Sequence, residues 1–275
     1  MTQHPATPKP FNRILLTGAA GGLGRVLREA LPTHAHIVRA SDISPMTPSR
    51  GKHDEVAYCD LADKAGVAAL VKDVDAIVHL GGVSVERPFE QILEANIRGT
   101  FHVYEAARQH GVKRIVFASS NHVTGFYPQG VEVDAHSPRR PDGYYGLSKA
   151  YGEDMATFYF HRYGIQTVSV RIGSSFPQPR NRRMLSTWLS YPDLEHLVAR
   201  ALLADQVEHT VVYGVSNNRD PWWNNRHAAH LGFAPQDNSQ VFRAQVEQQT
   251  KPAEQQPGSG FQGGPFTVAG PFGDD

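Results

Sequence analysis

Tyr145 and Lys149 are the two residues whose types and spacing most directly indicate proton-transfer chemistry. They stand four residues apart in GYYGLSKAYGEDM, so a helix places both side chains on one face, one turn from each other. A tyrosine ionises near pH ~10. A lysine cation at ~5 Å, with an effective dielectric constant of ~20, favours the phenolate by about 3 kcal/mol, or about two pKa units. We therefore expect Tyr145, rather than Tyr144 with its uncharged neighbour Ser148, to act as a general base near neutral pH.

A cluster of polar side chains follows the apolar run Arg114–Ala118, in the stretch IVFASSNHVTG. Its members are Ser119, Ser120, Asn121 and His122. Ligands of open α/β sheets bind at the carboxyl ends of the strands, which is where these residues are expected. A serine hydroxyl at this place can hydrogen-bond the oxygen of a reacting substrate.

The stretch RILLTGAAGGLGRVL places several glycines between a strand-like run and a helix-like run. These glycines are Gly18, Gly21, Gly22 and Gly24. Glycine allows a tight turn and lets a phosphate approach the backbone N–H groups, while the helix N-terminus supplies partial positive charge. The pattern predicts a pyrophosphate site at the first strand–helix turn.

Two acidic residues at later strand ends extend this prediction towards an adenosine. Asp42 ends the second strand-like run, where a carboxylate can accept both ribose hydroxyls and repel a 2′-phosphate. NAD is therefore favoured over NADP, although Arg39 and Arg50 stand nearby. Asp60, after the third run, can meet the adenine amino group or cap the following helix.

Positioning these residues requires an alternation of strands and helices, and the first two-thirds of the chain has this pattern. The helix-like segments are Gly22–Leu31, Asp63–Val71, Pro88–His110 and Tyr144–Tyr163. They separate strand-like runs at Arg13–Thr17, Ile37–Ser41, Glu55–Tyr58, Ala76–Leu80, Arg114–Ala118 and Gln166–Arg171. Strands that are apolar on both faces and joined by helices indicate a parallel sheet covered on both sides.

The remaining chain is less regular. A helix is predicted over Tyr191–Leu203 and a last strand over Thr210–Val215. We divide the chain into a leader (1–11), one α/β domain (12–245) with substrate loops mainly from 172–235, and a tail (246–275) rich in Gln, Pro and Gly. The tail can complete the substrate pocket, contact a neighbouring subunit, or be loose. The Trp222-Trp223 pair can line a pocket or an interface, or pack in the core.

Composition excludes several classes of protein. The 275 residues hold 27 Lys and Arg against 27 Asp and Glu, so there is no electrostatic signature of nucleic-acid or anionic-membrane binding. The single cysteine, Cys59, cannot form an intramolecular disulfide. We expect no signal peptide and no membrane span, because the N-terminus has no apolar core and no run approaches ~20 apolar residues. We expect no metal site, because the 14 histidines are scattered along the chain. The expected location is the cytoplasm.

As a set, these motifs resemble the extended short-chain dehydrogenase/reductase family. The matching features between residues 13 and 175 are TGAAGGLG, the Asp42 position, LGG after the fourth strand, NIRGT, SSN and YxxxK. The resemblance implies a Rossmann-type, doubly wound parallel sheet of about seven strands with a small C-terminal substrate-binding part. It also implies a catalytic triad of Ser120, Tyr145 and Lys149, in which Lys149 also contacts the nicotinamide ribose. Further NAD contacts are implied for Leu23, Ile43, Leu61, Leu80 and Asn96.

Within this family, the chain is similar to uronate dehydrogenases. The similarity lies in GGVS before the long helix, SSNHVTGFYP, the 174–183 loop and the QGGPF stretch of the tail. It implies NAD-dependent oxidation of the anomeric carbon of galacturonate or glucuronate to an aldaric acid lactone by a homo-oligomeric enzyme. The residues implied to bind the sugar are Ser84, Ser120, Asn121, His122, Tyr145 and Ser174. Arg183 would hold the carboxylate, with Arg180 and Arg182 as alternatives.

Two other functions are compatible with parts of the pattern. A nucleotide-sugar epimerase or dehydratase shares the glycine loop, Tyr145 and Lys149, but a dehydratase carries an acidic pair where Asn121 and His122 stand. An NAD-binding sensor without turnover is expected to have lost Tyr145 or Lys149, and both are present. His122 can also be a structural hydrogen-bonding residue.

Overall fold

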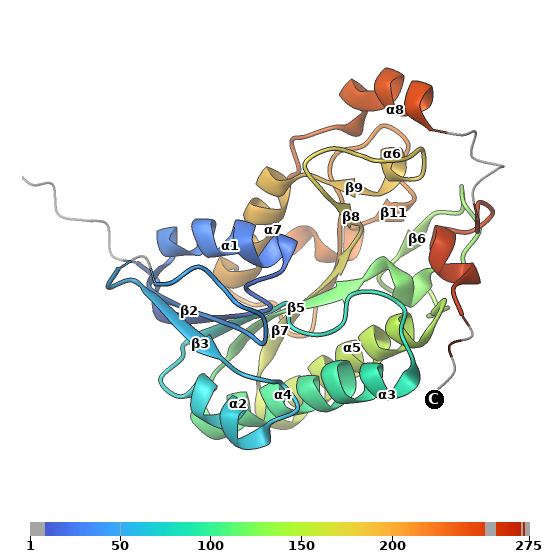
Figure 1. Cartoon of the computed structure of the whole chain (residues 1–275). Coiled ribbons are helices and arrows are strands. Elements are labelled where there is room, and N and C mark those ends of the chain that lie inside the picture. Colours follow the sequence, from blue (N-terminus) through green and yellow to red (C-terminus); the bar gives the residue numbers. More distant parts are fainter. Residues whose placement is uncertain (1–8, 50, 251–256, 271, 273–275) are drawn as a thin grey trace, which may run out of the picture.

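The central feature of the protein is a seven-stranded sheet in which every strand is parallel to its neighbours (Figure 1). The computed structural model describes residues 9–49, 51–250, 257–270 and 272. The strand order is β10-β7-β5-β4-β1-β2-β3. These strands are β1 (Phe11–Thr17), β2 (Ala35–Asp42), β3 (Asp54–Tyr58), β4 (Ala76–His79), β5 (Arg114–Ser120), β7 (Gln166–Ile172) and β10 (Val211–Gly214). The expected Rossmann-type sheet is confirmed, with strand ends within two residues of the predicted ones.

Two layers of helices cover the sheet (Figure 1). One layer holds α1 (Gly22–Ala30) and α7 (Tyr191–Leu203), whose apolar side chains pack with the strands around Leu16, Val78 and Val170. The other holds α2 (Lys64–Val71), α4 (Gly99–His110) and α5 (Tyr144–Tyr163), packed around Leu15, Ile77 and Phe117. Alternate strand residues therefore enter the two cores, as expected for a sheet buried on both faces. No helix in the described ranges is long and apolar enough to cross a membrane.

The long helix predicted over Pro88–His110 is interrupted by a π-helical segment. It consists of α3 (Phe89–Ile92), the π-helix η2 (Leu93–Arg98) and α4. Widened turns of this kind frequently occur at functional sites. Here the π-helix carries the buried Asn96, whose amide contacts the loop after β4.

Short elements between β5 and the C-terminus build the rim above the sheet. The two small pairs are β6 (Val133–Asp134) with β11 (Trp223–Asn224), and β8 (Ser174–Ser175) with β9 (Trp188–Leu189). The other short elements of this part are α6 (Met184–Thr187), α8 (Arg243–Gln249) and the 3₁₀ helices η3 (Asn121–Thr124), η4 (Arg226–Leu231), η5 (Ser239–Phe242) and η7 (Gly264–Val268). A further 3₁₀ helix, η1 (Leu31–Thr33), joins α1 to β2.

The C-terminal segment does not form a tail separate from the domain. Helix α8 continues across the expected boundary at residue 246, because Val246 is buried. Residues 257–270 then lie against the segment after β5, beside β6 in Figure 1. Gln262 N–H donates to the Tyr127 carbonyl at 2.8 Å, and Gly263 N–H donates to the Gly125 carbonyl at 2.8 Å. Gly263, Pro265 and Phe266 of this segment line the cavity described below.

Candidate active site

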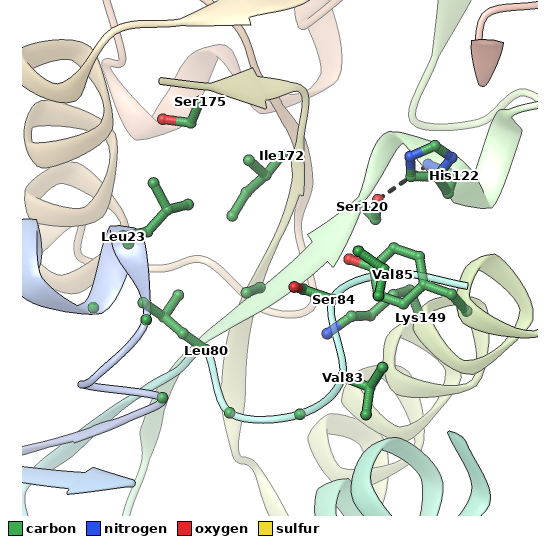
Figure 2. A pocket seen from close by; sticks show the side chains of 18 of the residues that line it. Leu23, Leu80, Val83, Ser84, Val85, Ser120, His122, Lys149, Ile172 and Ser175 are labelled. Atoms are coloured by element: carbon green, nitrogen blue, oxygen red, sulfur yellow. Dashed lines mark hydrogen bonds between the residues drawn. The ribbon is translucent and has the colours of Figure 1, made fainter. Parts of the chain in front are cut away.

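A cavity of about 1020 Å³ opens at the carboxyl ends of the strands. Its floor lies between the neighbouring strands β1 and β4, where the order of strands in the sheet reverses. α/β proteins bind dinucleotides at this point of the sheet. Figure 2 shows Leu23, Leu80 and Ile172 on one side of this cavity, and Ser84, Ser120, His122 and Lys149 on the other. Apart from Asn96, every residue expected in the site lines this cavity.

The glycine loop has the geometry that a pyrophosphate site requires. Gly18 has a φ of +72°, which favours glycine, and a Cβ there would lie 2.8 Å from the Gly81 nitrogen. A Cβ on Gly24 would overlap the Gly18 carbonyl oxygen, so helix α1 packs directly on the loop. The chain can therefore bring backbone N–H groups and a helix N-terminus to a bound phosphate.

Asp42 stands at the edge of this loop, and its carboxylate holds two backbone groups. Oδ2 accepts from Ala20 N–H at 2.9 Å and Oδ1 accepts from Ser44 N–H at 2.9 Å. Each oxygen keeps a further lone pair for a ribose hydroxyl. Asp60 also lines the cavity, and the cap of α2 is Asp63, not Asp60.

Ser120, Tyr145 and Lys149 converge at the centre of the cavity. Ser120 ends β5, and its hydroxyl accepts from His122 N–H at 3.2 Å (Figure 2). The Lys149 ammonium nitrogen lies 5.1 Å from the centre of the Phe117 ring and 5.6 Å from that of Tyr145. The helical spacing thus brings the expected pair together.

The expected pKa shift of Tyr145 is wrong for the free protein. Burial raises the pKa of the Tyr145 phenol to about 12, while the hydrogen bond with Ser120 lowers it and the Asp142 charge raises it. Burial also lowers the pKa of Lys149 to about 8, which weakens its cationic influence. Removal from water outweighs the lysine–tyrosine attraction because neither charge is solvated in this site.

His122 is held by a buried acidic residue that sequence reasoning missed. Its Nδ1 lies 2.6 Å from Asp142 Oδ2. Since a carboxylate only accepts, Nδ1 carries the proton and Nε2 remains an acceptor. Burial lowers the pKa of His122, although Asp142 opposes this shift. Asp142 precedes Tyr145 by three residues in the chain, which is a signal that could have indicated it.

The three candidate arginines occupy different environments. Arg183 lies inside the cavity, and burial lowers its pKa to about 10. Arg180 lies on the rim with its guanidinium 3.8 Å from the Phe176 ring centre. Arg182 does not line the cavity and donates to the Glu247 carbonyl at 2.9 Å. The choice of Arg183 among the three therefore fits its position.

Arg183 makes three hydrogen bonds within the protein. Nε donates to the Gln262 carbonyl at 2.6 Å and Nη1 donates to Ser174 Oγ at 3.2 Å. The Asn121 side-chain amide is oriented so that its NH₂ group donates to the Ile172 carbonyl at 3.1 Å and its oxygen accepts from Arg183 Nη2 at 2.9 Å. Among the described residues, no carboxylate lies within ion-pair distance of Arg183.

Asn96 does not line the cavity. Its Oδ1 accepts from Val83 N–H at 2.7 Å, while Nδ2 donates to the Val83 carbonyl at 3.0 Å and to Ser148 Oγ at 2.9 Å. The amide is thus fully used in joining the loop of Ser84 to helix α5. Asn96 thus lies behind the residues that line the cavity, and its contact with the cofactor stays a prediction.

Phe266, from the C-terminal segment, is one of the lining residues that the sequence did not indicate. Its ring stacks on His122 with 3.8 Å between ring centres, and it lies 6.0 Å from the Tyr145 ring. Nothing in the sequence indicated that this phenylalanine lies beside Tyr145 and His122. Among the described residues, no three His, Cys, Asp or Glu side chains form a group suited to a metal ion.

Comparison with known proteins agrees with this geometry. The family described as the NAD dependent epimerase/dehydratase family matches residues 14–191. The chain belongs to this family. The glycine loop and Asp42 fit its cofactor, so the prediction of NAD is confirmed.

Individual relatives are more specific. A uronate dehydrogenase of Pseudomonas syringae pv. tomato is 65% identical over 274 residues, which cover 100% of each chain. The crystal structure of uronate dehydrogenase from Agrobacterium tumefaciens is 48% identical, with a TM-score of 0.93 over 96% of this chain and 99% of that one. A mutant of that enzyme complexed with NAD has a TM-score of 0.92 at 48% identity, over 95% of this chain and 99% of that one.

Proposed function

We propose that this protein oxidises the anomeric carbon of a hexuronic acid, galacturonate or glucuronate, with NAD. The observation that carries the proposal is Arg183, which lines the cavity that holds Tyr145 and Lys149. Among the described residues no carboxylate forms an ion pair with it, and the charge of Asp142 raises its pKa less than burial lowers it. A buried cation without a counter-ion is costly unless a ligand supplies the negative charge. The relatives named as uronate dehydrogenases support the same substrate class.

The hydrogen bonds of Arg183 leave room for a carboxylate. A guanidinium has five N–H groups, and three of them bond Gln262, Ser174 and Asn121. One N–H remains on each terminal nitrogen, which is the number a bidentate carboxylate requires. The substrate carboxylate would then lie at the far end of the cavity from the glycine loop.

The catalytic roles follow from the positions of the side chains. When bound, NAD supplies the hydride acceptor and the positive charge of its nicotinamide ring. Tyr145 accepts the proton of the anomeric hydroxyl, and Ser120 hydrogen-bonds the same oxygen. Lys149, one turn along α5, stabilises the phenolate and holds the nicotinamide ribose. His122 and Ser84 orient the sugar hydroxyls.

The product follows from the ring form of the substrate. A cyclic uronic acid carries its anomeric hydroxyl on a carbon that also bears the ring oxygen. Loss of the hydroxyl proton to Tyr145 and of hydride from this carbon leaves a carbonyl beside that oxygen, which is a lactone. No water is added in this step, so the immediate product is the aldaric acid lactone.

The test is a spectrophotometric assay of NADH formation at pH 8. Galacturonate and glucuronate should give NADH, while glucose and UDP-glucose run in parallel as neutral and nucleotide-linked sugars. Tyr145→Phe should reduce turnover by about 10²–10⁴-fold, the usual contribution of a general base. Arg183→Ala should raise the uronate KM, and Arg182→Ala, outside the cavity, is its matched control. Absence of NADH with both uronates would refute the proposal.

A further inference from the structure

The C-terminal segment is built around Arg183. The shortest hydrogen bond of this arginine, at 2.6 Å, runs to the backbone carbonyl of Gln262, 79 residues further along the chain. Two residues later, Gly264 has a φ of +59°, and a Cβ there would lie 2.7 Å from Arg183 Cδ. The segment therefore passes close against the stem of the arginine as well as accepting its Nε proton.

The side chain of Gln262 fixes this carbonyl in place. It is 0% exposed. Oε1 accepts from Trp223 Nε1 at 2.8 Å, while Nε2 donates to the Val131 carbonyl at 2.7 Å and to the Pro128 carbonyl at 3.2 Å. The site thus demands one acceptor and two donors on a flat amide.

The backbone of Gln262 is equally constrained. Its N–H donates to the Tyr127 carbonyl at 2.8 Å, and its own carbonyl accepts from Arg183. All four polar atoms of this residue therefore have partners. A buried residue whose polar atoms are all hydrogen-bonded is held in one orientation. Its backbone carbonyl, which accepts from Arg183, is therefore fixed as well.

We propose that Gln262 is a positioning residue that orients Arg183 and so sets the preference for a sugar that carries a carboxylate. This inference rests on the proposed function of Arg183. Fixing a flexible arginine side chain costs rotamer entropy, so an arginine that is held in place before its ligand arrives binds that ligand more tightly. Bidentate recognition also depends on orientation, which a single backbone acceptor at Nε controls.

The test compares kcat and KM for galacturonate and for NAD in wild type, Gln262→Leu and Gln262→Glu. Gln262→Leu keeps a similar volume but loses all side-chain hydrogen bonds, and the galacturonate KM should rise about tenfold. The KM for NAD should change less than about twofold, because the glycine loop is distant from this bond. Loss of affinity for NAD to the same extent would indicate general damage and overturn the proposal.

Gln262→Glu adds a readout that a purely structural role would not produce. A carboxylate can still accept from Trp223 Nε1 but cannot donate to the Val131 carbonyl, whereas a protonated carboxyl can. The ratio of its galacturonate KM to that of wild type should therefore fall as pH is lowered from 8 to 6. A constant ratio would count against the proposed role of the amide donors. If Gln262→Leu does not fold, the pH dependence of Gln262→Glu still tests the proposal.

Gln129→Leu is the matched control. Gln129 also ties the segment down, through Nε2 to the Phe261 carbonyl at 3.0 Å, but it does not contact Arg183. Its galacturonate KM should stay within about twofold of wild type. An equal rise in both leucine variants would assign the effect to a loosened tail and overturn the specific role of Gln262. Wild type without uronate activity would instead refute the proposed function, and this inference with it.

Discussion

Tyr145 and Lys149 are buried side by side, and burial favours the neutral form of both side chains. The pKa of Tyr145 is raised to about 12 and that of Lys149 is lowered to about 8. The free protein therefore holds the phenol protonated at neutral pH. Under the proposed mechanism, the positive nicotinamide supplies the charge that favours the phenolate, so the base is formed only when NAD is bound.

This protonation behaviour can be measured directly. The tyrosinate absorbance of wild type minus that of Tyr145→Phe should appear only near pH 12 in the free protein. The raised pKa means that the folded state keeps its proton as pH passes ~10, where an exposed tyrosine ionises. Saturating NAD should move the difference to lower pH. A difference signal near pH 10 without NAD would contradict this account.

Asp42 offers a second test at the scale of one residue. Asp42→Asn removes the charge but keeps one oxygen for the Ala20 or Ser44 N–H group. The variant should lose affinity for NAD by about tenfold, since hydrogen bonds to a charged group contribute ~1.5–3 kcal/mol. Its activity with NADP should rise, because the repulsion of the 2′-phosphate is gone. The measurement is the ratio of kcat/KM for NAD to kcat/KM for NADP in wild type and in Asp42→Asn. An unchanged ratio would reject the role of Asp42 in selecting NAD.

At the scale of elements, helix α5 is fixed by a carboxylate from another segment. Glu86 Oε1 accepts from Tyr144 N–H at 2.7 Å and Oε2 accepts from Tyr145 N–H at 2.9 Å. A carboxylate at a helix N-terminus satisfies free N–H groups and is favoured by the helix dipole. Glu86 belongs to the loop of Ser84, so this contact couples that loop to the helix that carries Tyr145 and Lys149. Asn96 makes a second connection between the same two elements.

The coupling predicts a combined effect on stability and catalysis. Glu86→Ala leaves the buried Tyr145 N–H and the half-buried Tyr144 N–H without their acceptor, so the free energy of unfolding should fall by about 1–3 kcal/mol. The kcat should fall as well, because Tyr145 is the second of these donors. Denaturant unfolding and steady-state kinetics measure the two effects. The exposed Glu90→Gln, in the first turn of α3, is the control. A loss of stability with unchanged kcat would show that the cap does not position Tyr145.

At the scale of the whole molecule, a buried histidine makes the fold sensitive to acid. His79, at the end of β4, is 1% exposed, and its Nδ1 lies 2.7 Å from Thr17 Oγ1. Its Nε2 has no hydrogen-bond partner among the residues that the structure describes. Burial lowers its pKa from 6.5 to about 3, with a smaller effect from Lys149. Below pH 6.5 the unfolded chain binds a proton at His79 that the folded chain does not. Stability is therefore lost as pH falls from 6.5 towards 3.

The variant His79→Asn should reduce this loss. An asparagine can retain the bond to Thr17 but does not titrate, so its decrease in unfolding free energy from pH 7 to pH 5 should be about 2 kcal/mol smaller than that of wild type. Urea unfolding at the two pH values is the measurement. His110→Asn, on the exposed end of α4, should behave as wild type. Equal pH dependence in wild type and His79→Asn would exclude His79 as the main cause.

The sequence alone determined the sheet, its helical layers and the gathering of nearly all predicted site residues around one cavity. Strand–helix alternation and apolar runs are local patterns, and the carboxyl ends of parallel strands necessarily share one edge, so Gly18, Asp42 and Ser120 could be assigned to one site. The spacing of Tyr145 and Lys149 was sufficient to pair them, because a helix fixes that geometry.

Only the tertiary structure decided the protonation of that pair and the closure of the pocket. Desolvation depends on how many distant segments cover a group, which spacing does not encode, and it reversed the expected shift of Tyr145. Asn96, in the π-helical segment, bonds to Val83 and does not line the cavity. Gln262 and Phe266 reached Arg183 and His122 through contacts that join far ends of the chain. Such contacts depend on the packing of the whole fold, not on a local pattern.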